Sequence, residues 1–387
     1  MKKICLLIFI HLCIAASAGN DSTSVKSRFR HELGMYGGIG YIMPTNGFYC
    51  GFNPLGRHFT DTRSAFVQYS FSYPESSRYG RLYPSAYQGF SIGINSFGSH
   101  EHIGTPISLH FHQGASIASL GGRFTLDYEW HLGLSYGWVT GNDGLTASMT
   151  NITLGGGFFL AWRPKDRCRF TLGPEFTHFS NGDTSFPNLG TNTVGVRLGI
   201  SALFGPQRST VTSARIFAAE GEKKKFNERM SYDLTLSGGW RGDRFLYDGS
   251  IVMINDKFPI ASISFNPLFH FNRYLSMGPA LDVVLDRSAN LLAYEMDASG
   301  TIGYNYPPLV DQIAPAASMR VEIRMAMVAL NGGFGYSFSY DESDMDVMFG
   351  IFNLKAFLSD VMYIGLSYRL SSRMYTHNLT FGLGWRL

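Results

Sequence analysis

Segments of about ten residues in which polar and apolar side chains alternate recur along most of this 387-residue chain. Alternation with period two indicates β-strands with two different faces, and the polar turn clusters between the segments are typical of membrane β-barrels. Barrels of bacterial outer membranes have even strand counts, so we expect the second set below to contain one spurious strand. We predict strands at 31–43, 62–73, 87–97, 105–114, 122–138, 147–162, 168–180 and 191–204, and then at 229–241, 244–254, 258–270, 273–286, 312–326, 328–339, 343–356, 359–370 and 376–387.

The N-terminus predicts export. Lys2 and Lys3 precede a short apolar core, Ile4 to Ala15, and Ala16-Ser17-Ala18 offers a cleavage site, so residues 1–18 are interpreted as a signal peptide. Aromatic residues make up 15% of the chain and charged residues only 16%, against roughly 25% in a typical soluble domain. Together with the lack of amphipathic helices, this predicts an all-β fold: a transmembrane, antiparallel barrel in the outer membrane of a Gram-negative bacterium.

Two arrangements of the mature chain are compatible with the pattern. The stretch 205–228 is the most hydrophilic part of the sequence and separates a first half, 19–204, from a second half, 229–387. It reads as a linker or a long periplasmic turn. The chain therefore forms either one barrel of roughly 16 strands or two consecutive eight-stranded barrels, and a weak likeness between the halves suggests a duplication.

Three polar residues are expected on the lipid-facing side of the first half. His178 and Ser180 end the predicted strand 168–180 on the face that carries its apolar residues, whereas Glu175 points into the lumen. Asn192 begins the returning strand 191–204, also on the apolar face. Polar groups are unfavourable on such a surface unless they bond to one another or serve a function.

These residue types suit nucleophilic catalysis on an ester. A serine hydroxyl becomes a good nucleophile when an imidazole takes its proton and a third group orients that imidazole. Residues i and i+2 on a strand lie about 7 Å apart at the backbone, a gap that side chains can close. The loop from Gly182 to Gly190 could present Asn188 or a backbone N–H to an oxyanion.

The same segment resembles the lipid A 3-O-deacylases of bacterial outer membranes. Their pattern of His-x-Ser-Asn, then Pro-Asn, then Gly within about fifteen positions is matched by His178, Ser180, Asn181, Pro187, Asn188 and Gly190. The resemblance covers 19–204 at the level of the fold. It implies that His178 is the general base and Ser180 the nucleophile, with Asn188 as oxyanion donor and Asn181 in support. It also implies lipid A, or lipopolysaccharide, as the substrate.

One position departs from the pattern. Well-known members of the family have Glu where this chain has Asn192. Asparagine can accept a hydrogen bond from the imidazole and fix its tautomer, but it cannot stabilise the imidazolium with a full charge. Asp183, from the loop, is an alternative third member, whereas Glu175 is excluded by its lumen face.

Two other functions are compatible with the same sequence. The alternative is a non-enzymatic barrel, a pore or structural protein with a decayed active site, and a third option is an esterase acting on phospholipid. The second half has Leu370 and Ser372 where the first has His178 and Ser180, so we expect no catalysis there.

No cofactor or metal site is expected, since His110 and His112 have no evident third ligand. The net charge of +3 is too small to indicate nucleic acid, and the expected partners are outer-membrane lipids. The sequence carries no signal for an oligomeric state. Cys50 and Cys168 are not expected to pair, and tryptophans such as Trp138 and Trp162 predict interfacial girdles.

Overall fold

The computed structural model describes residues 29–74, 76–141, 144–205, 229–247, 250–296, 302–325, 327–338, 348–371 and 378–387. The expected signal peptide 1–18, nearly all of the expected linker 205–228 and Ser372 lie outside these residues. The chain divides into two compact units, each built around one closed barrel.

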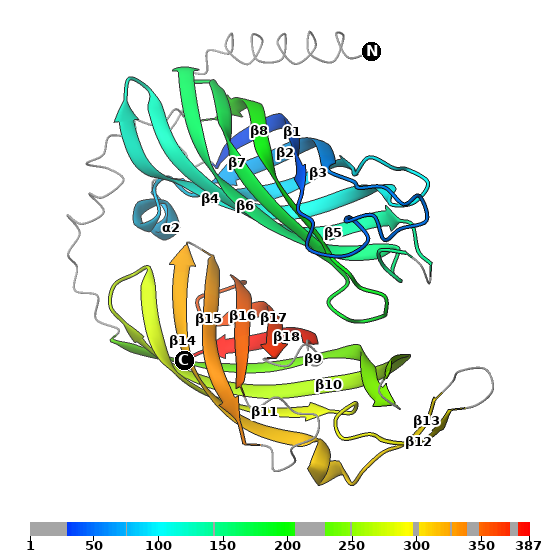
Figure 1. Ribbon diagram of the computed structural model, residues 1–387. Helices are drawn as coiled ribbons and strands as arrows, with labels where there is room; N and C mark the ends of the chain where they lie inside the picture. Colours follow the sequence, from blue (N-terminus) through cyan, green and yellow to red (C-terminus); the bar gives the residue numbers. More distant parts are fainter. Residues whose placement is uncertain are drawn as a thin grey trace. The chain divides into compact units, whose positions relative to one another are not determined.

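The first barrel is an antiparallel meander in which each strand pairs with its neighbours in sequence (Figure 1). It closes when the first strand pairs with the eighth, from His31 opposite Phe204 to Ile42 opposite Thr193. A short helix, α2 (Arg78–Leu82), lies between the second and third strands. The strands are β1 (Arg30–Ile42), β2 (Asp61–Ser72), β3 (Tyr87–Ser96), β4 (Gly104–Gly121), β5 (Phe124–Trp138), β6 (Thr150–Lys165), β7 (Cys168–Ser180) and β8 (Thr191–Phe204).

The second barrel repeats this architecture. Its first and last strands pair from Thr380 opposite Gly239 to Arg386 opposite Asp233. A separate two-stranded sheet, β12 (Leu292–Met296) and β13 (Ile302–Asn305), and a 3₁₀ turn, η2 (Leu309–Gln312), stand between its third and fourth strands. The barrel strands are β9 (Met230–Tyr247), β10 (Ser250–His270), β11 (Leu275–Asp286), β14 (Ile313–Met325), β15 (Val328–Ser337), β16 (Met348–Phe357), β17 (Met362–Ser371) and β18 (Asn378–Arg386). Of the two predicted arrangements, two eight-stranded barrels is therefore correct.

The predicted strands of the first half all form, and the spurious strand of the second half is 244–254. That segment is divided between the end of β9 and the start of β10, which form one long hairpin. The charged residues near Arg241 resemble a turn in the sequence. In the structure they continue the strand, and Arg241 is buried with its Nε 3.1 Å from Asp286.

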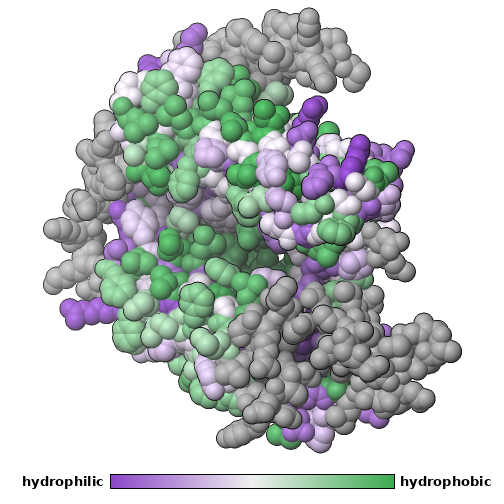
Figure 2. All heavy atoms as spheres, in the orientation of Figure 1, coloured by the Kyte–Doolittle hydropathy of each residue, from purple (hydrophilic) through white to green (hydrophobic). Residues whose placement is uncertain are grey.

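The two faces of the barrel strands differ as the alternation predicts. Hydrophobic residues cover the strands on the outside, and hydrophilic residues gather toward the strand ends (Figure 2). In the first barrel the exposed apolar side chains include Phe90, Ile92, Leu109, Leu134, Phe158, Leu172, Phe176, Val194, Val196 and Leu198. Among the described residues, no helix is long and apolar enough to cross a membrane. The outer surface of these strands is suited to contact with lipid.

The inside of the first barrel is filled by charged and polar side chains that neutralise one another. Arg169 donates to Asp127 at 2.7 Å and to Glu32 at 2.9 Å. Nearer to the end of the barrel where β5 finishes, Arg197 donates to Glu129 at 2.7 Å and to Glu175 at 3.1 Å. Buried charges of this kind are tolerated because each has an opposite charge and hydrogen bonds.

The histidines that the sequence places on one face of β4 also lie in this lumen. His112 contacts the Ser70 hydroxyl at 2.8 Å, and the His110 ring stacks on His131 with centroids 4.5 Å apart. Across the described residues, no group of three or more metal-ligating side chains comes together. Cys50 lies in the loop after β1 and Cys168 begins β7, so the two thiols belong to opposite ends of the barrel.

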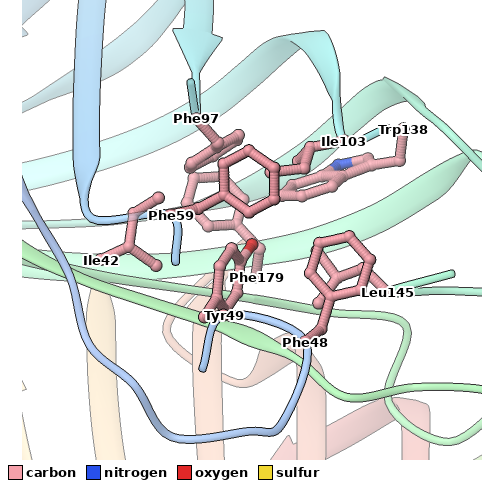
Figure 3. Close-up of a cluster of buried hydrophobic side chains, with 9 residues drawn as sticks. All are labelled: Ile42, Phe48, Tyr49, Phe59, Phe97, Ile103, Trp138, Leu145 and Phe179. Carbon is pink, nitrogen blue, oxygen red and sulfur yellow. The ribbon is translucent and has the colours of Figure 1, made fainter. Parts of the chain in front are cut away.

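An apolar cluster caps one end of the first barrel (Figure 3). It gathers side chains from the ends of β1, β5 and β7 and from the loops beside them: Ile42, Phe48, Tyr49, Phe59, Phe97, Ile103, Trp138, Leu145 and Phe179. We call this set the cap. Trp162 is 42% exposed on the outer face, as an interfacial girdle requires, but Trp138 is only 2% exposed. The girdle prediction for Trp138 is therefore wrong, because its side chain packs inside the cap against Phe97 and Phe179 instead of at the membrane interface.

Replacing Arg197 with leucine should destabilise the first barrel strongly. Glu129 and Glu175 would be left as buried carboxylates without their cation, which typically lowers the free energy of unfolding by about 3–5 kcal/mol. Urea unfolding in detergent micelles, followed by heat-modifiable electrophoretic mobility, measures the change. Arg57→Leu is the control: this exposed side chain lies over the Phe59 ring, and its loss should cost no more than about 1 kcal/mol. Equal stability of the two variants would contradict a structural role for the lumen network.

Candidate active site

His178 and Ser180 lie at the end of β7, on its outward side. His178 is the Cα partner of Leu154 on β6 and of Asn192 on β8, and Ser180 is the partner of Ile152. All three polar residues are half-buried. Phe179, between them in sequence, points the other way and is packed in the cap. The lumen-facing phenylalanine thus anchors the strand end that presents His178 and Ser180 on the opposite face.

The structure joins His178 to Asn192. The imidazole Nδ1 lies 2.7 Å from the amide oxygen Oδ1 of Asn192. An amide oxygen only accepts hydrogen bonds, so Nδ1 is the protonated nitrogen in this arrangement and Nε2 carries the lone pair. This is the tautomer that a general base for a serine hydroxyl requires.

Sequence reasoning missed the residues that support Asn192. The Asn192 amide donates from Nδ2 to the Thr45 hydroxyl at 2.9 Å, and Asn46 donates to the backbone carbonyl of Gly190 at 2.7 Å. Both belong to the loop that follows β1. No local pattern marks them, because 147 positions separate Thr45 from Asn192. The turn-forming run Pro44-Thr45-Asn46-Gly47 at a strand end was the available signal, and only barrel closure places it beside β8.

The loop between β7 and β8 contains the rest of the expected motif. Asn188 donates from its amide to Asp183 at 2.8 Å, so Asp183 orients the expected oxyanion donor. Gly190 has a φ of 67°, a left-handed conformation that favours glycine. A Cβ at Gly190 would also lie 3.4 Å from Cε1 of His178, which explains a small residue beside the imidazole.

The remaining expectations have mixed outcomes. Glu175 lies in the lumen with Arg197, as predicted. Asp183 was an alternative partner for His178, yet the imidazole is bonded to Asn192 and Asp183 accepts from Asn188. In the second barrel, Leu370 is an ordinary member of β17 opposite Gly350.

The residue types gathered here are those that acyl transfer uses. A serine hydroxyl, an imidazole two residues before it on the same strand face, and a side chain that fixes the imidazole tautomer are the parts that a serine hydrolase needs. Their position on the apolar outer surface favours a substrate that is itself held in lipid.

Truncating Phe179 should damage the barrel far more than truncating Phe176 on the same strand. Phe179 is 3% exposed within the cap, whereas Phe176 is 44% exposed on the outer face. Phe179→Ala leaves a cavity and should lower the free energy of unfolding by about 3–5 kcal/mol. Lipid or detergent refills the space beside Phe176, so Phe176→Ala should have less than half that effect. Urea unfolding in micelles compares them, and equal losses would show that the cap does not anchor the end of β7.

Comparison with known proteins supplies the family. A model described as "Lipid A 3-O-deacylase (PagL)" matches residues 107–201, and one described as "Acyloxyacyl hydrolase, C-terminal domain" matches residues 230–387. No curated protein matches the sequence.

Solved structures show only a distant likeness. A TodX monoaromatic hydrocarbon channel mutant has 10% identity and a TM-score of 0.19, over 94% of this chain and 90% of that one. An outer membrane channel from Pseudomonas putida F1 has 8% identity and a TM-score of 0.22, over 95% and 98%. Such low TM-scores carry no information about function. The first family model, however, covers the first barrel from β4 to β8 and includes His178, Ser180 and Asn192, and the second covers the whole of the second barrel. The chain belongs to the lipid A 3-O-deacylase family.

Proposed function

We propose that this protein is an outer-membrane serine esterase that removes an ester-linked acyl chain from lipid A. The observation that carries the proposal is the hydrogen bond from His178 Nδ1 to Asn192, on the outer face of the barrel and two residues from Ser180. The family supports lipid A as the substrate, and the apolar surface around the site suits a substrate whose acyl chains stay in the membrane.

In the proposed mechanism, Ser180 Oγ attacks the ester carbonyl carbon while Nε2 of His178 takes the hydroxyl proton. The tetrahedral intermediate collapses, the bond to the sugar oxygen breaks, and the imidazolium returns its proton to that oxygen. Water then attacks the acyl-serine with the same base, which releases a free fatty acid and restores Ser180. The Asn188 amide, oriented by Asp183, and Asn181 are the proposed donors to the oxyanion.

The loop lengths support an outward-facing site. Outer-membrane barrels have short periplasmic turns and longer extracellular loops. The loops at the site end span 43–60, 97–103, 139–149 and 181–190, whereas the turns at the other end after β4 and β6 contain only two residues each. Of the connections that join strands of the first barrel at the other end, 73–86, which includes α2, is the long one. Ser180 would then face the outer leaflet, where lipopolysaccharide is found.

The rival function, a pore, finds less support in the described interior. Arg169 and Arg197 cross the lumen of the first barrel and pair with carboxylates from other strands. In the second barrel Lys355 and Arg386 do the same with Asp233 and Glu322. We propose that the second barrel has no catalytic centre of its own, since Leu370 stands where the first has its base.

Replacing Ser180 with alanine should abolish lipid A deacylation. Mass spectrometry of lipid A from cells expressing the wild type should show the loss of one hydroxyacyl group, and cells expressing Ser180→Ala should show none. Ser119→Ala is the control and should behave as the wild type, because Ser119 lies on β4 at the end of the barrel away from the site. Identical lipid A from the wild type and Ser180→Ala, with both folded in the outer membrane, would refute this function. Phospholipids from the same cells test the phospholipid substrate.

Replacing Asn192 with glutamate should raise the turnover number by roughly tenfold. A hydrogen bond to an ionised acceptor is about twice as strong as a neutral one, and about 1.4 kcal/mol of extra imidazolium stabilisation corresponds to a factor of ten. Asn192→Ala should lower turnover, because nothing then fixes the imidazole. The initial rate of fatty acid release from lipopolysaccharide in micelles measures both. A Glu variant that is slower than the wild type would argue that Asn192 is not the third member.

A further inference from the structure

The chain just before β8 has two backbone carbonyl groups that strand pairing does not reach. β8 begins at Thr191, and its ladder with β1 ends at the pair of Thr193 and Ile42. Its ladder with β7 ends at Thr191. Leu189 and Gly190 come before these pairs, so their carbonyl groups need hydrogen-bond donors from outside the sheet.

Asn46, in the loop that follows β1, supplies these donors. Its side-chain Nδ2 donates to the carbonyl of Gly190 at 2.7 Å and to that of Leu189 at 3.1 Å. Its Oδ1 accepts from the backbone N–H of Tyr49 at 3.2 Å. A carbonyl only accepts and a backbone N–H only donates, so these three partners admit one orientation of the amide. The half-buried Asn46 side chain therefore joins loop 43–60 to loop 181–190 in a defined geometry.

The segment that Asn46 holds lies against the proposed general base. A Cβ at Gly190 would be 3.4 Å from Cε1 of His178, and the left-handed φ of 67° at Gly190 lets the backbone pass this close to the ring. Asn192, which is bonded to Nδ1 of the same ring, follows two residues later. A displacement of this backbone would therefore be transmitted both to the imidazole and to the residue that orients it.

The loop that carries Asn46 is anchored in the cap. Tyr49, three residues later, is a buried member of the cap (Figure 3), and its hydroxyl lies 2.6 Å from that of Thr191. The backbone N–H of Leu189 donates at 3.1 Å to the carbonyl of Leu145, another cap residue. Both sides of the Asn46 contact are thus tied to the same buried cluster, so the contact is part of a packed structure and not a meeting of two surface loops.

We propose that Asn46 is a positioning residue for the esterase site. By holding the backbone at Gly190, it keeps His178 and Asn192 in the geometry that proton transfer from Ser180 requires. The inference rests on the proposed function and adds a residue from the opposite end of the first barrel's sequence. The three hydrogen bonds of Asn46 go to backbone groups, so it acts on the rate of the chemical step and not on substrate binding.

Asn46→Asp isolates the two donated hydrogen bonds. Aspartate keeps the shape of the side chain and the oxygen that accepts from Tyr49, but it has no N–H to donate to the carbonyl groups of Leu189 and Gly190. It should lower kcat for fatty acid release from lipopolysaccharide in micelles roughly tenfold, with KM changed by less than about twofold. A loss confined to KM, or a kcat equal to that of the wild type, would overturn the proposal.

Asn53→Asp is the matched control, because Asn53 makes the same set of hydrogen bonds within one loop. Its amide donates to the carbonyls of Phe48 at 2.7 Å and Arg57 at 2.6 Å, and its oxygen accepts from the N–H of Leu55 at 3.0 Å. Urea unfolding should show similar losses of stability in the two variants, whereas kcat of Asn53→Asp should stay within about twofold of the wild type. Equal losses of kcat would show that the first variant acts only through loop stability, and the proposal would fail.

The position of the imidazole can also be followed without measuring activity. In protein labelled with ¹³C at histidine Cε1, the His178 signal is assigned by its absence from His178→Gln. The signal should shift and broaden in Asn46→Asp and in Asn46→Ala, and it should stay unchanged in Asn53→Asp. An unchanged signal in both Asn46 variants overturns the proposal whatever the activity. If the wild type has no Ser180-dependent esterase activity, the proposed function fails by itself, and this signal alone decides whether Asn46 positions His178.

Discussion

Every backbone N–H and C=O group of a strand that faces lipid must be hydrogen-bonded, because lipid offers no partner for it. Both barrels meet this need by closing on themselves, β1 on β8 and β9 on β18. Closure separates two environments, an apolar outside and an interior where Arg169 and Arg197 are matched with carboxylates. Polar residues are unfavourable on the apolar outer face unless they are hydrogen-bonded. His178 and Asn192, which lie on that face, bond directly to each other.

The outer site relies on the inside of the barrel. Alternation along β7 sends His178 and Ser180 outward and Phe179 into the cap, so the packing of one face fixes the position of the other. The register between β7 and β8 places His178 opposite Asn192, and a slip of one residue would turn every side chain to the wrong face. The same cap holds the loop after β1, which reaches Asn192 through Thr45.

In the proposed active site, Asn192 stands where the resemblance places a glutamate, and this changes how the site is organised. A carboxylate would hold and stabilise a charged imidazolium directly. Asn192 supplies a neutral hydrogen bond instead, and its geometry comes from a chain of contacts: the cap, the loop around Asn46, Thr45 and then the amide. Preorganised polar groups of this kind can compensate in part for a missing charge, because they need not reorient during the reaction.

The β-barrel class, every strand of the first barrel, and the faces of His178, Ser180 and Glu175 could be predicted from the residues, because alternation with period two is a local property. Three features could be seen only in the folded chain: the barrel closes after eight strands, the segment around Arg241 continues a strand, and Trp138 is buried in the cap. It also brought Thr45 to Asn192. These features depend on hydrogen bonds and packing between segments far apart in the chain, and no local pattern of residues encodes which distant segments will meet.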